Sequence, residues 1–198
     1  MFQGSFKQII SRWFLETPQT LIGLVYSDLN IGLSKIETIE YFDGATYIIN
    51  KNSKTNNGIT FGSFININTT NEIPYTDNKF DPTKEGVYMH EYGHYRQSQE
   101  LLSLYLPVIG LLSFASATIF NEKLFDPPFS KHKKNWVERW ANKRAAHYFK
   151  DYDVDWNKDV TLYKNPHTEK MEYYPLAELN QCIFNPAYRF VVNVIDVL

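Results

Sequence analysis

Two histidines and a glutamate in residues 90–94 have the types and spacing best suited to chemistry in this chain. The segment is His90-Glu91-Tyr92-Gly93-His94, and the whole chain holds five histidines. Residues four apart lie on one face of a helix, so both imidazoles can bind one metal ion while Glu91 leans toward it. A zinc ion held in this way lowers the pKa of its bound water to about 7, and the adjacent carboxylate takes a proton as the water attacks a carbonyl. The motif therefore predicts zinc-dependent hydrolysis with Glu91 as general base, and the alternative is a pair of merely hydrogen-bonded histidines.

The residues around this motif have the pattern of a helix. Asp81 followed by Pro82 predicts a helix start, and the next proline is Pro107, so we expect a helix over about 82–104. Spacings of three and four predict that the motif shares its face with the core positions Val87, Ser98, Leu101 and Leu102. Gly93 costs about 1 kcal/mol inside a helix, which indicates that something approaches the backbone closely there.

A catalytic zinc site needs a third protein ligand from another part of the chain. Glu138 is the best candidate, because a helix predicted over about 134–149 puts Glu138, Ala141, Asn142 and Ala145 on one side. Most of these side chains are small or short, so this side can pack closely against the first helix. Asn142 could orient a ligand histidine.

Other assignments remain open for these positions. Glu138 could instead be exposed and paired with Arg139, Lys134 or Asn142 on a solvated helix. The substitutes for it as a metal ligand are His132, His147, Glu122 and Asp126. His147 is also a candidate donor to the oxyanion of the reaction, a role that a tyrosine could fill as well.

Two histidines from H-E-x-x-H with a glutamate from a later helix resemble the gluzincin branch of the zinc metallopeptidases. That branch often carries Asp where this chain has Asn142. Residues 18–23, 61–68 and 105–110 also look like a zincin-like domain of Bacteroidetes, sometimes found at the C-terminal end of RHS-repeat proteins. This second resemblance covers about residues 17–150.

The resemblance implies an α+β, zincin-like fold in which a small mixed or antiparallel sheet is followed by packed metal-binding helices. It implies a Zn²⁺ cofactor and a protein or peptide substrate. It further implies an effector or toxin module, exported or secreted as part of a longer bacterial protein, with an immunity or inhibitor protein as a possible partner.

Residues 101–120 contain no charged side chain. A transmembrane helix of that length spans about 30 Å and would leave Glu138 on the opposite side of the membrane from His90. Pro107 and Gly110 divide the run, so a buried helix-turn-helix or a re-entrant hairpin fits better. A membrane-associated zinc peptidase is the alternative.

The first third of the chain predicts two helices followed by strands. The helices cover about 6–15 and 17–28, with Thr17 as the cap of the second, and the strands cover 37–42, 45–50 and 59–68. Asp43-Gly44 is a tight-turn signal between the first two strands. By the resemblance, Phe61–Asn68 would line the cleft, with Phe61, Gly62, Ser63 and Phe64 as the substrate-rim candidates. A short helix over 176–181 and a strand over 188–197 are expected near the end of the chain.

Composition bounds the remaining possibilities. The net charge of −2 offers no basic field for nucleic acid, and the 28 Phe and Tyr residues supply bulk for one core. Residues 1–5 resemble a cloning remnant, so we expect a single catalytic domain over 6–198. The lone Cys182 can form no internal disulfide. A zinc-stabilised domain that binds a partner without hydrolysis is the competing functional hypothesis.

Overall fold

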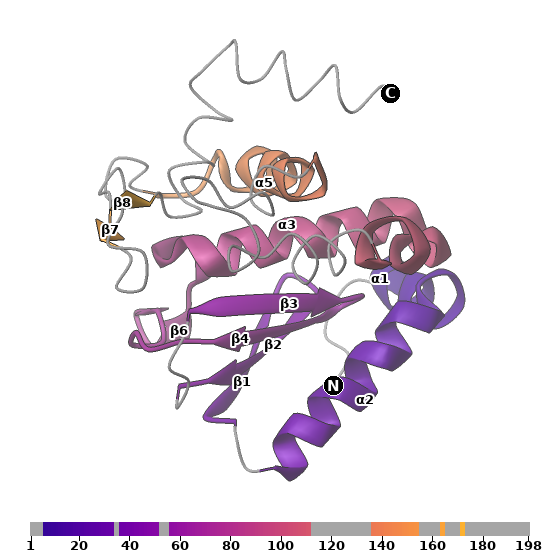
Figure 1. Cartoon of the computed structure of the whole chain (residues 1–198), viewed down its shortest axis with the longest axis horizontal. Coiled ribbons are helices and arrows are strands. Elements are labelled where there is room, and N and C mark those ends of the chain that lie inside the picture. The colour runs from indigo at the N-terminus through magenta and orange to yellow at the C-terminus, as the bar shows by residue number, and fades with distance from the viewer. Residues whose placement is uncertain are drawn as a thin grey trace.

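A four-stranded sheet with helices on both faces is the centre of the computed structural model (Figure 1). The structure describes residues 6–33, 36–51, 56–111, 136–154, 163–164 and 171–172. Several sequence predictions lie outside these residues: the segments 1–5, 112–120, 176–181 and 188–197, and the substitute ligands Glu122, Asp126 and His132. The described part is a mixed α+β fold, as the sequence predicts.

The sheet is mixed, with the strand order β1-β2-β4-β3. Its strands are β1 (Thr38–Phe42), β2 (Ala45–Asn50), β3 (Asn57–Phe61) and β4 (Phe64–Asn68). The β1–β2 and β3–β4 pairs are antiparallel, whereas β2 and β4 run parallel. Short antiparallel pairs form between β5 (Tyr75–Thr76) and β6 (Lys79–Phe80), and between β7 (Tyr163–Lys164) and β8 (Met171–Glu172). Within the four-stranded sheet, β1 and β3 are therefore the edge strands.

Two tight turns set the register of the sheet. Asp43 and Gly44 both have positive φ, 31° and 87°, as a type I′ hairpin requires, and this confirms the predicted turn. The prediction of one strand over 59–68 is wrong, because Gly62 (φ 58°) and Ser63 turn the chain between β3 and β4. A Cβ at Gly62 would also lie 2.5 Å from Thr20 Oγ1. The uninterrupted apolar and β-branched pattern around Gly62 hides this turn.

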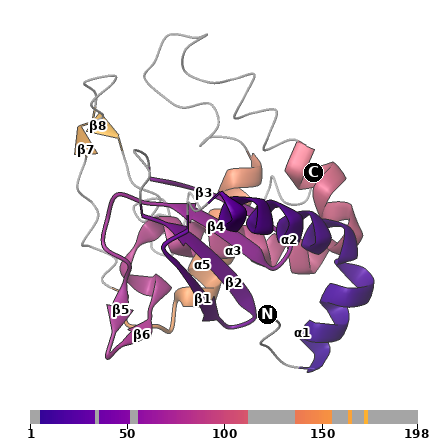
Figure 2. The ribbon, with the colours of Figure 1, turned by 90° about the horizontal axis from the view of Figure 1, so that it is seen from below.

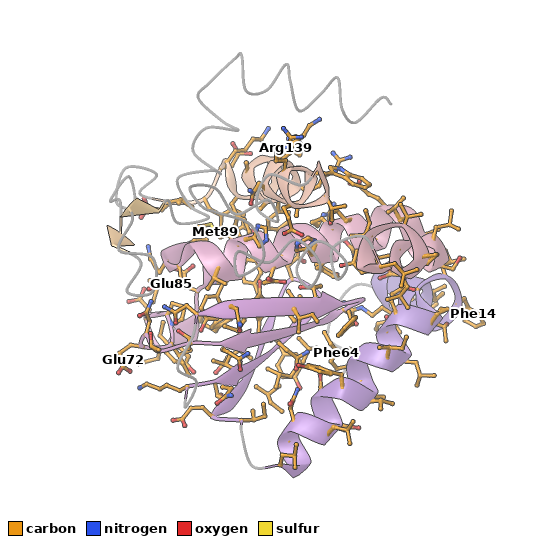
Figure 3. The ribbon with its side chains drawn as sticks, in the orientation of Figure 1. Phe14, Phe64, Glu72, Glu85, Met89 and Arg139 are labelled. Atoms are coloured by element: carbon orange, nitrogen blue, oxygen red, sulfur yellow. The ribbon has the colours of Figure 1, made fainter. Side chains whose placement is uncertain are left out.

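The longest of the three N-terminal helices covers one face of the sheet. Helix α1 (Phe6–Ile10) continues as the π-helix η1 (Ser11–Leu15), and α2 (Thr17–Gly32) follows with Glu16 at its N-cap, in place of the predicted Thr17. Ser27 Oγ donates to Asn66 Oδ1 of β4 at 3.3 Å. Figure 2 shows α2 across the strands, and Figure 3 shows Phe64 between the sheet and α2.

Helix α3 (Gly86–Leu101) lies against the other face of the sheet and carries the H-E-x-x-H motif. It starts four residues later than predicted, because Asp81 caps the 3-10 helix η2 (Pro82–Lys84) by accepting from Thr83 N, and Glu85 then has an extended conformation. The short helices η3 (Leu102–Leu104) and η4 (Leu106–Gly110) follow. Within the described ranges, no helix is both long and apolar enough to cross a membrane.

Helix α5 (Trp136–Phe149) covers the outer side of α3, so α3 lies between the sheet and α5 (Figure 1). Burial on both sides explains why α3 has few solvent-facing positions. The main core joins side chains of β2, β4, α3 and α5, including Tyr47, Ile65, Met89, Tyr92 and Phe149. The motif is therefore held in the best-packed part of the fold.

Candidate metal centre

The two helices that carry the candidate ligands approach each other at Gly93. A Cβ built on Gly93 would collide with the carbonyl oxygen of Ala141 on α5, so no larger residue fits without a shift of backbone. This confirms the expectation that something approaches the backbone at Gly93. The α5 residues that the spacing predicts on one side are all buried, namely Glu138, Ala141, Asn142 and Ala145, and Val137 beside them is buried as well.

His90, His94 and Glu138 come together where α3 and α5 meet. Glu138 Oε2 lies 3.2 Å from His90 Nε2 and 3.2 Å from His94 Nε2. The two imidazole rings are 4.9 Å apart between centroids and nearly perpendicular, at 88°. His94 and Glu138 are buried, while the His90 side chain is 14% exposed, so His90 marks the open side of the cluster.

This cluster could hold a metal ion. One ligand atom from each of the three residues lies within 4.8 Å of the others. Four-coordinate zinc, with bonds of about 2.0–2.2 Å to nitrogen and oxygen, places neighbouring ligand atoms about 3.4 Å apart. Two imidazole nitrogens and a carboxylate oxygen are also the donor types that zinc prefers. The donor types and the two 3.2 Å separations from Glu138 are therefore compatible with a metal ion of the size of zinc.

Hydrogen bonds fix the outward nitrogen of each ligand histidine. Gln97 Nε2 donates to the carbonyl oxygen of Val137 at 2.9 Å, which leaves Gln97 Oε1 facing His94 Nδ1 at 2.8 Å. Because an amide oxygen can only accept, His94 Nδ1 must carry a hydrogen, and in the neutral ring Nε2 then has a free lone pair. His90 Nδ1 lies 2.6 Å from Asn142 Oδ1, an arrangement with the same effect. Both Nε2 lone pairs are thus turned toward Glu138, as a shared cation requires.

In the metal-free protein, a proton can take the place of that cation. Burial lowers the pKa of His90, but the hydrogen bond to Glu138 and the negative charges of Glu91 and Glu138 outweigh it and raise the pKa to about 9. Burial lowers the pKa of His94, but the charge of Glu138, its hydrogen bond and the charge of Glu91 together outweigh burial and the charge of His90, so this pKa is also raised. Burial raises the pKa of Glu138, yet the two histidines hold it well below its usual range. The negative charge of Glu138 therefore favours a positive charge on or between the two imidazoles.

The carboxylate of Glu91 points to the sheet side of α3 and contacts β3. Thr60 Oγ1 lies 2.7 Å from Glu91 Oε2 and 3.1 Å from the Glu91 carbonyl oxygen. The hydroxyl has one proton, so the shorter bond to the carboxylate is the favoured one. A Cβ at Gly58 would lie 2.6 Å from both Cδ and Oε1 of Glu91, so the absence of a side chain there makes room for the carboxylate.

The other predicted site residues lie elsewhere. His147 is on α5 but exposed, unlike the buried Glu138. The four substrate-rim candidates lie where β3 joins β4: Phe61 is the last residue of β3, Gly62 and Ser63 form the turn, and Phe64 is the first residue of β4. Gly62 packs against Thr20, and the Phe61 ring meets Tyr26 of α2 with 5.6 Å between centroids. The strand that contacts Glu91 is β3, through Gly58 and Thr60.

Sequence reasoning missed four residues around the cluster. Thr60 and Gly58 have no signal of their own in the sequence, since their contacts to Glu91 join segments far apart in the chain. Gln97 is one helical turn from His94, but its amide is oriented by the distant Val137 carbonyl oxygen. Tyr105 is the fourth: its hydroxyl donates to the Thr60 carbonyl oxygen at 3.2 Å, and burial, together with the charges of Glu91 and Glu138, raises its pKa well above the usual range. The negative charges of both carboxylates therefore act on the buried Tyr105 hydroxyl and disfavour its ionised form.

We compared the chain with models of known protein families, with curated proteins and with solved structures, and found no match.

Proposed function

We propose that this chain is a zinc-dependent peptidase of the gluzincin type, in which His90, His94 and Glu138 hold the metal. One observation carries the proposal: helix α3 presents two ligand nitrogens to the Glu138 carboxylate and also carries the separate carboxylate of Glu91. A purely structural zinc site needs four protein ligands and no base. Three ligands with an adjacent carboxylate are the arrangement that hydrolysis uses.

The chain's own residues divide the chemistry as follows. Zinc, when bound, supplies a Lewis acid that polarises the scissile carbonyl and activates water. Glu91 takes a proton from the attacking water and later gives it to the leaving amine. Asn142 and Gln97 keep the ligand histidines oriented. Together these roles describe peptide-bond hydrolysis without a covalent enzyme intermediate.

Tyr105 is the residue we propose as donor to the oxyanion, in place of the exposed His147. Its hydroxyl is held by one 3.2 Å bond to Thr60, which is weak enough to exchange for a stronger bond to a negatively charged oxygen. Loss of one such donor costs about 10²- to 10³-fold in kcat in hydrolases. Tyr105→Phe should therefore lower kcat and leave zinc content unchanged.

The substrate would be an extended peptide that lies along β3. This strand is an edge of the four-stranded sheet, and main-chain pairing at an edge strand is a common mode of peptide recognition. An effector or toxin role, export as part of a longer protein and an inhibitory immunity partner all belong to this proposal. They rest on the sequence resemblance alone.

Metal content and turnover test the proposal together. We expect about one zinc per chain in the purified wild type, a large loss in Glu138→Ala, and full zinc but no turnover in Glu91→Gln. Turnover would be sought with a library of internally quenched peptides. Wild-type cleavage by Glu91→Gln would rule out the mechanism. Zinc binding without any Glu91-dependent cleavage would instead support a zinc-stabilised binding domain.

A further inference from the structure

We infer that β3 is a positioning element for the general base: Thr60 holds Oε2 of Glu91, Gly58 leaves room for Oε1, and Oε1 is therefore the oxygen that takes the proton. This inference rests on the proposed function and goes further, because it assigns roles to two residues outside the zinc motif. Both belong to a strand more than thirty positions earlier in the chain than Glu91.

Thr60 fixes the direction of the carboxylate. Its side chain is buried, and its hydroxyl lies 2.7 Å from Glu91 Oε2, the range of a strong bond to a charged acceptor. In the described part of the chain, Oε1 has no hydrogen-bond donor. One carboxylate oxygen thus accepts a hydrogen bond from β3, while the other lies beside Gly58 without such a bond and can take a proton from water.

Gly58 acts through space and not through backbone conformation. Its φ lies outside the left-handed region, so an alanine could adopt the same backbone without strain. The methyl group of that alanine would nevertheless overlap the Glu91 side chain, with 2.6 Å to Oε1. A glycine at this position therefore lets the edge strand and the base lie in direct contact.

Tyr105 contacts the same residue of β3 in the substrate-free protein. Its hydroxyl donates to the carbonyl oxygen of Thr60, so the segment that follows α3 is tied to the residue that holds Glu91. The base is consequently positioned by two elements, its own helix α3 and the strand β3.

The test compares Thr60→Val, Thr60→Ser and Gly58→Ala with the control Thr46→Val. Valine has the shape of threonine without the hydroxyl, whereas serine keeps the hydroxyl. Thr46 is a buried threonine of β2, which is separated from β3 by β4, and no hydrogen bond among the described residues joins it to Glu91. Zinc content and Tm of each variant establish that the fold and the ligand set are intact.

Two readouts follow for each variant. The first is kcat and KM on the best peptide substrate. We expect Thr60→Val to lower kcat about 10- to 100-fold at unchanged KM, and Thr60→Ser to stay within about threefold of wild type.

The second readout needs no substrate. It is the affinity of the zinc-loaded protein for acetohydroxamate, which gives up a proton when it binds a metal. We expect Thr60→Val and Gly58→Ala to bind it about tenfold more weakly, and Thr46→Val to bind it as wild type does.

The inference and the proposed function fail in different ways. If Glu91→Gln loses activity and acetohydroxamate affinity while Thr60→Val and Gly58→Ala match wild type, β3 does not position the base and the inference is overturned. If Glu91→Gln itself matches wild type in both readouts, the proposed function is wrong and the inference goes with it. Loss in Thr60→Val that serine does not restore would assign the effect to packing, which also overturns the inference.

Discussion

At the scale of single residues, the hydrogen bond between His94 and Gln97 shows how a neutral side chain can orient a candidate metal ligand. Metal-bound histidines usually donate their second N–H to an oxygen acceptor, and substitution of that acceptor commonly costs 10- to 100-fold in metal affinity. Here the acceptor is an amide that is itself fixed by the Val137 carbonyl oxygen. Gln97 therefore links the orientation of one ligand to the start of α5, which carries another.

We expect Gln97→Leu to weaken zinc binding about 10- to 100-fold with little change in zinc-free stability beyond about 1–2 kcal/mol. The measurement is zinc affinity by competition with a chromophoric chelator. Gln99→Leu is the matched control, since Gln99 lies on the same helix and bonds Tyr95 and Arg96 instead of a ligand. Equal affinities in wild type and Gln97→Leu would contradict the role of Gln97.

Because the pKa of His90 is raised in the metal-free protein, we expect zinc binding to depend on pH. The pKa of His90 in the metal-free protein is about 9, so at pH 7 the ring is protonated, and zinc must displace that proton because it binds the neutral ring. Affinity should therefore rise with pH up to about 9, by about tenfold per unit for each proton released. Calorimetry at pH 7 in buffers with different ionisation enthalpies should detect release of about one proton or more. A binding enthalpy that is the same in every buffer would contradict this prediction.

The sequence revealed the chemistry-bearing residues unevenly. A local motif contains His90, Glu91 and His94. Glu138 could be predicted because two histidines leave a catalytic zinc site one protein ligand short, and because the small residues on one side of α5 allow close packing against α3. Thr60 and Gly58 could not be found in this way, since an ordinary threonine and glycine acquire their contacts to Glu91 only when β3 is laid against α3.

At the scale of elements, the contact between α3 and α5 sets the geometry of the centre. Both helices could be predicted, because their apolar and small residues recur at helical spacing. The turn at Gly62 and Ser63 could not, because strand-forming residues flank it on both sides. The start of α3 was also misplaced, since Asp81 and Pro82 begin a 3-10 helix with the same capping signals as an α-helix.

Gly93→Ala tests the helix contact. Alanine favours the helix by about 1 kcal/mol, but its methyl group would collide with the Ala141 carbonyl oxygen, and overpacking of this kind costs about 1–3 kcal/mol or more. We expect a net loss of unfolding free energy in chemical denaturation. Gly32→Ala at the end of α2 is the control, because a Cβ there meets nothing within 4 Å, and it should be neutral or slightly stabilising. A Gly93→Ala protein as stable as Gly32→Ala would show that the helices are free to separate.

At the scale of the whole molecule, the sheet order β1-β2-β4-β3 could not be read from the sequence. Local turns specify the two hairpins, but the parallel pairing of β2 with β4 depends on which faces α2 and α3 bury. Alternate residues of β4 face different helices: Asn66 bonds Ser27 of α2, while Ile65 and Ile67 join the core with α3. The global arrangement is thus decided by packing between elements.

Zinc should stabilise the whole fold, because its ligands lie on two separate helices. A ligand that binds only the folded state contributes RT ln(1 + [L]/Kd), about 4 kcal/mol at a thousandfold excess over Kd. We expect a chelator to lower the Tm of the zinc-loaded protein and added zinc to restore it. Glu138→Ala should show little response to either treatment. A wild-type Tm that ignores the chelator, after metal loss is verified, would contradict this coupling.

The close backbone contact between Gly93 and Ala141 should also make the metal affinity of the centre depend on ionic radius. With the two backbones in contact at Gly93 and Ala141, the opening between His90, His94 and Glu138 cannot widen without breaking that contact. Small ions such as Zn²⁺ and Co²⁺ should then be preferred over the larger Cd²⁺ by more than donor chemistry alone explains. Gly93→Ala should reduce the preference for the smaller ions, because its methyl group would push the two helices apart and widen the opening between the three side chains.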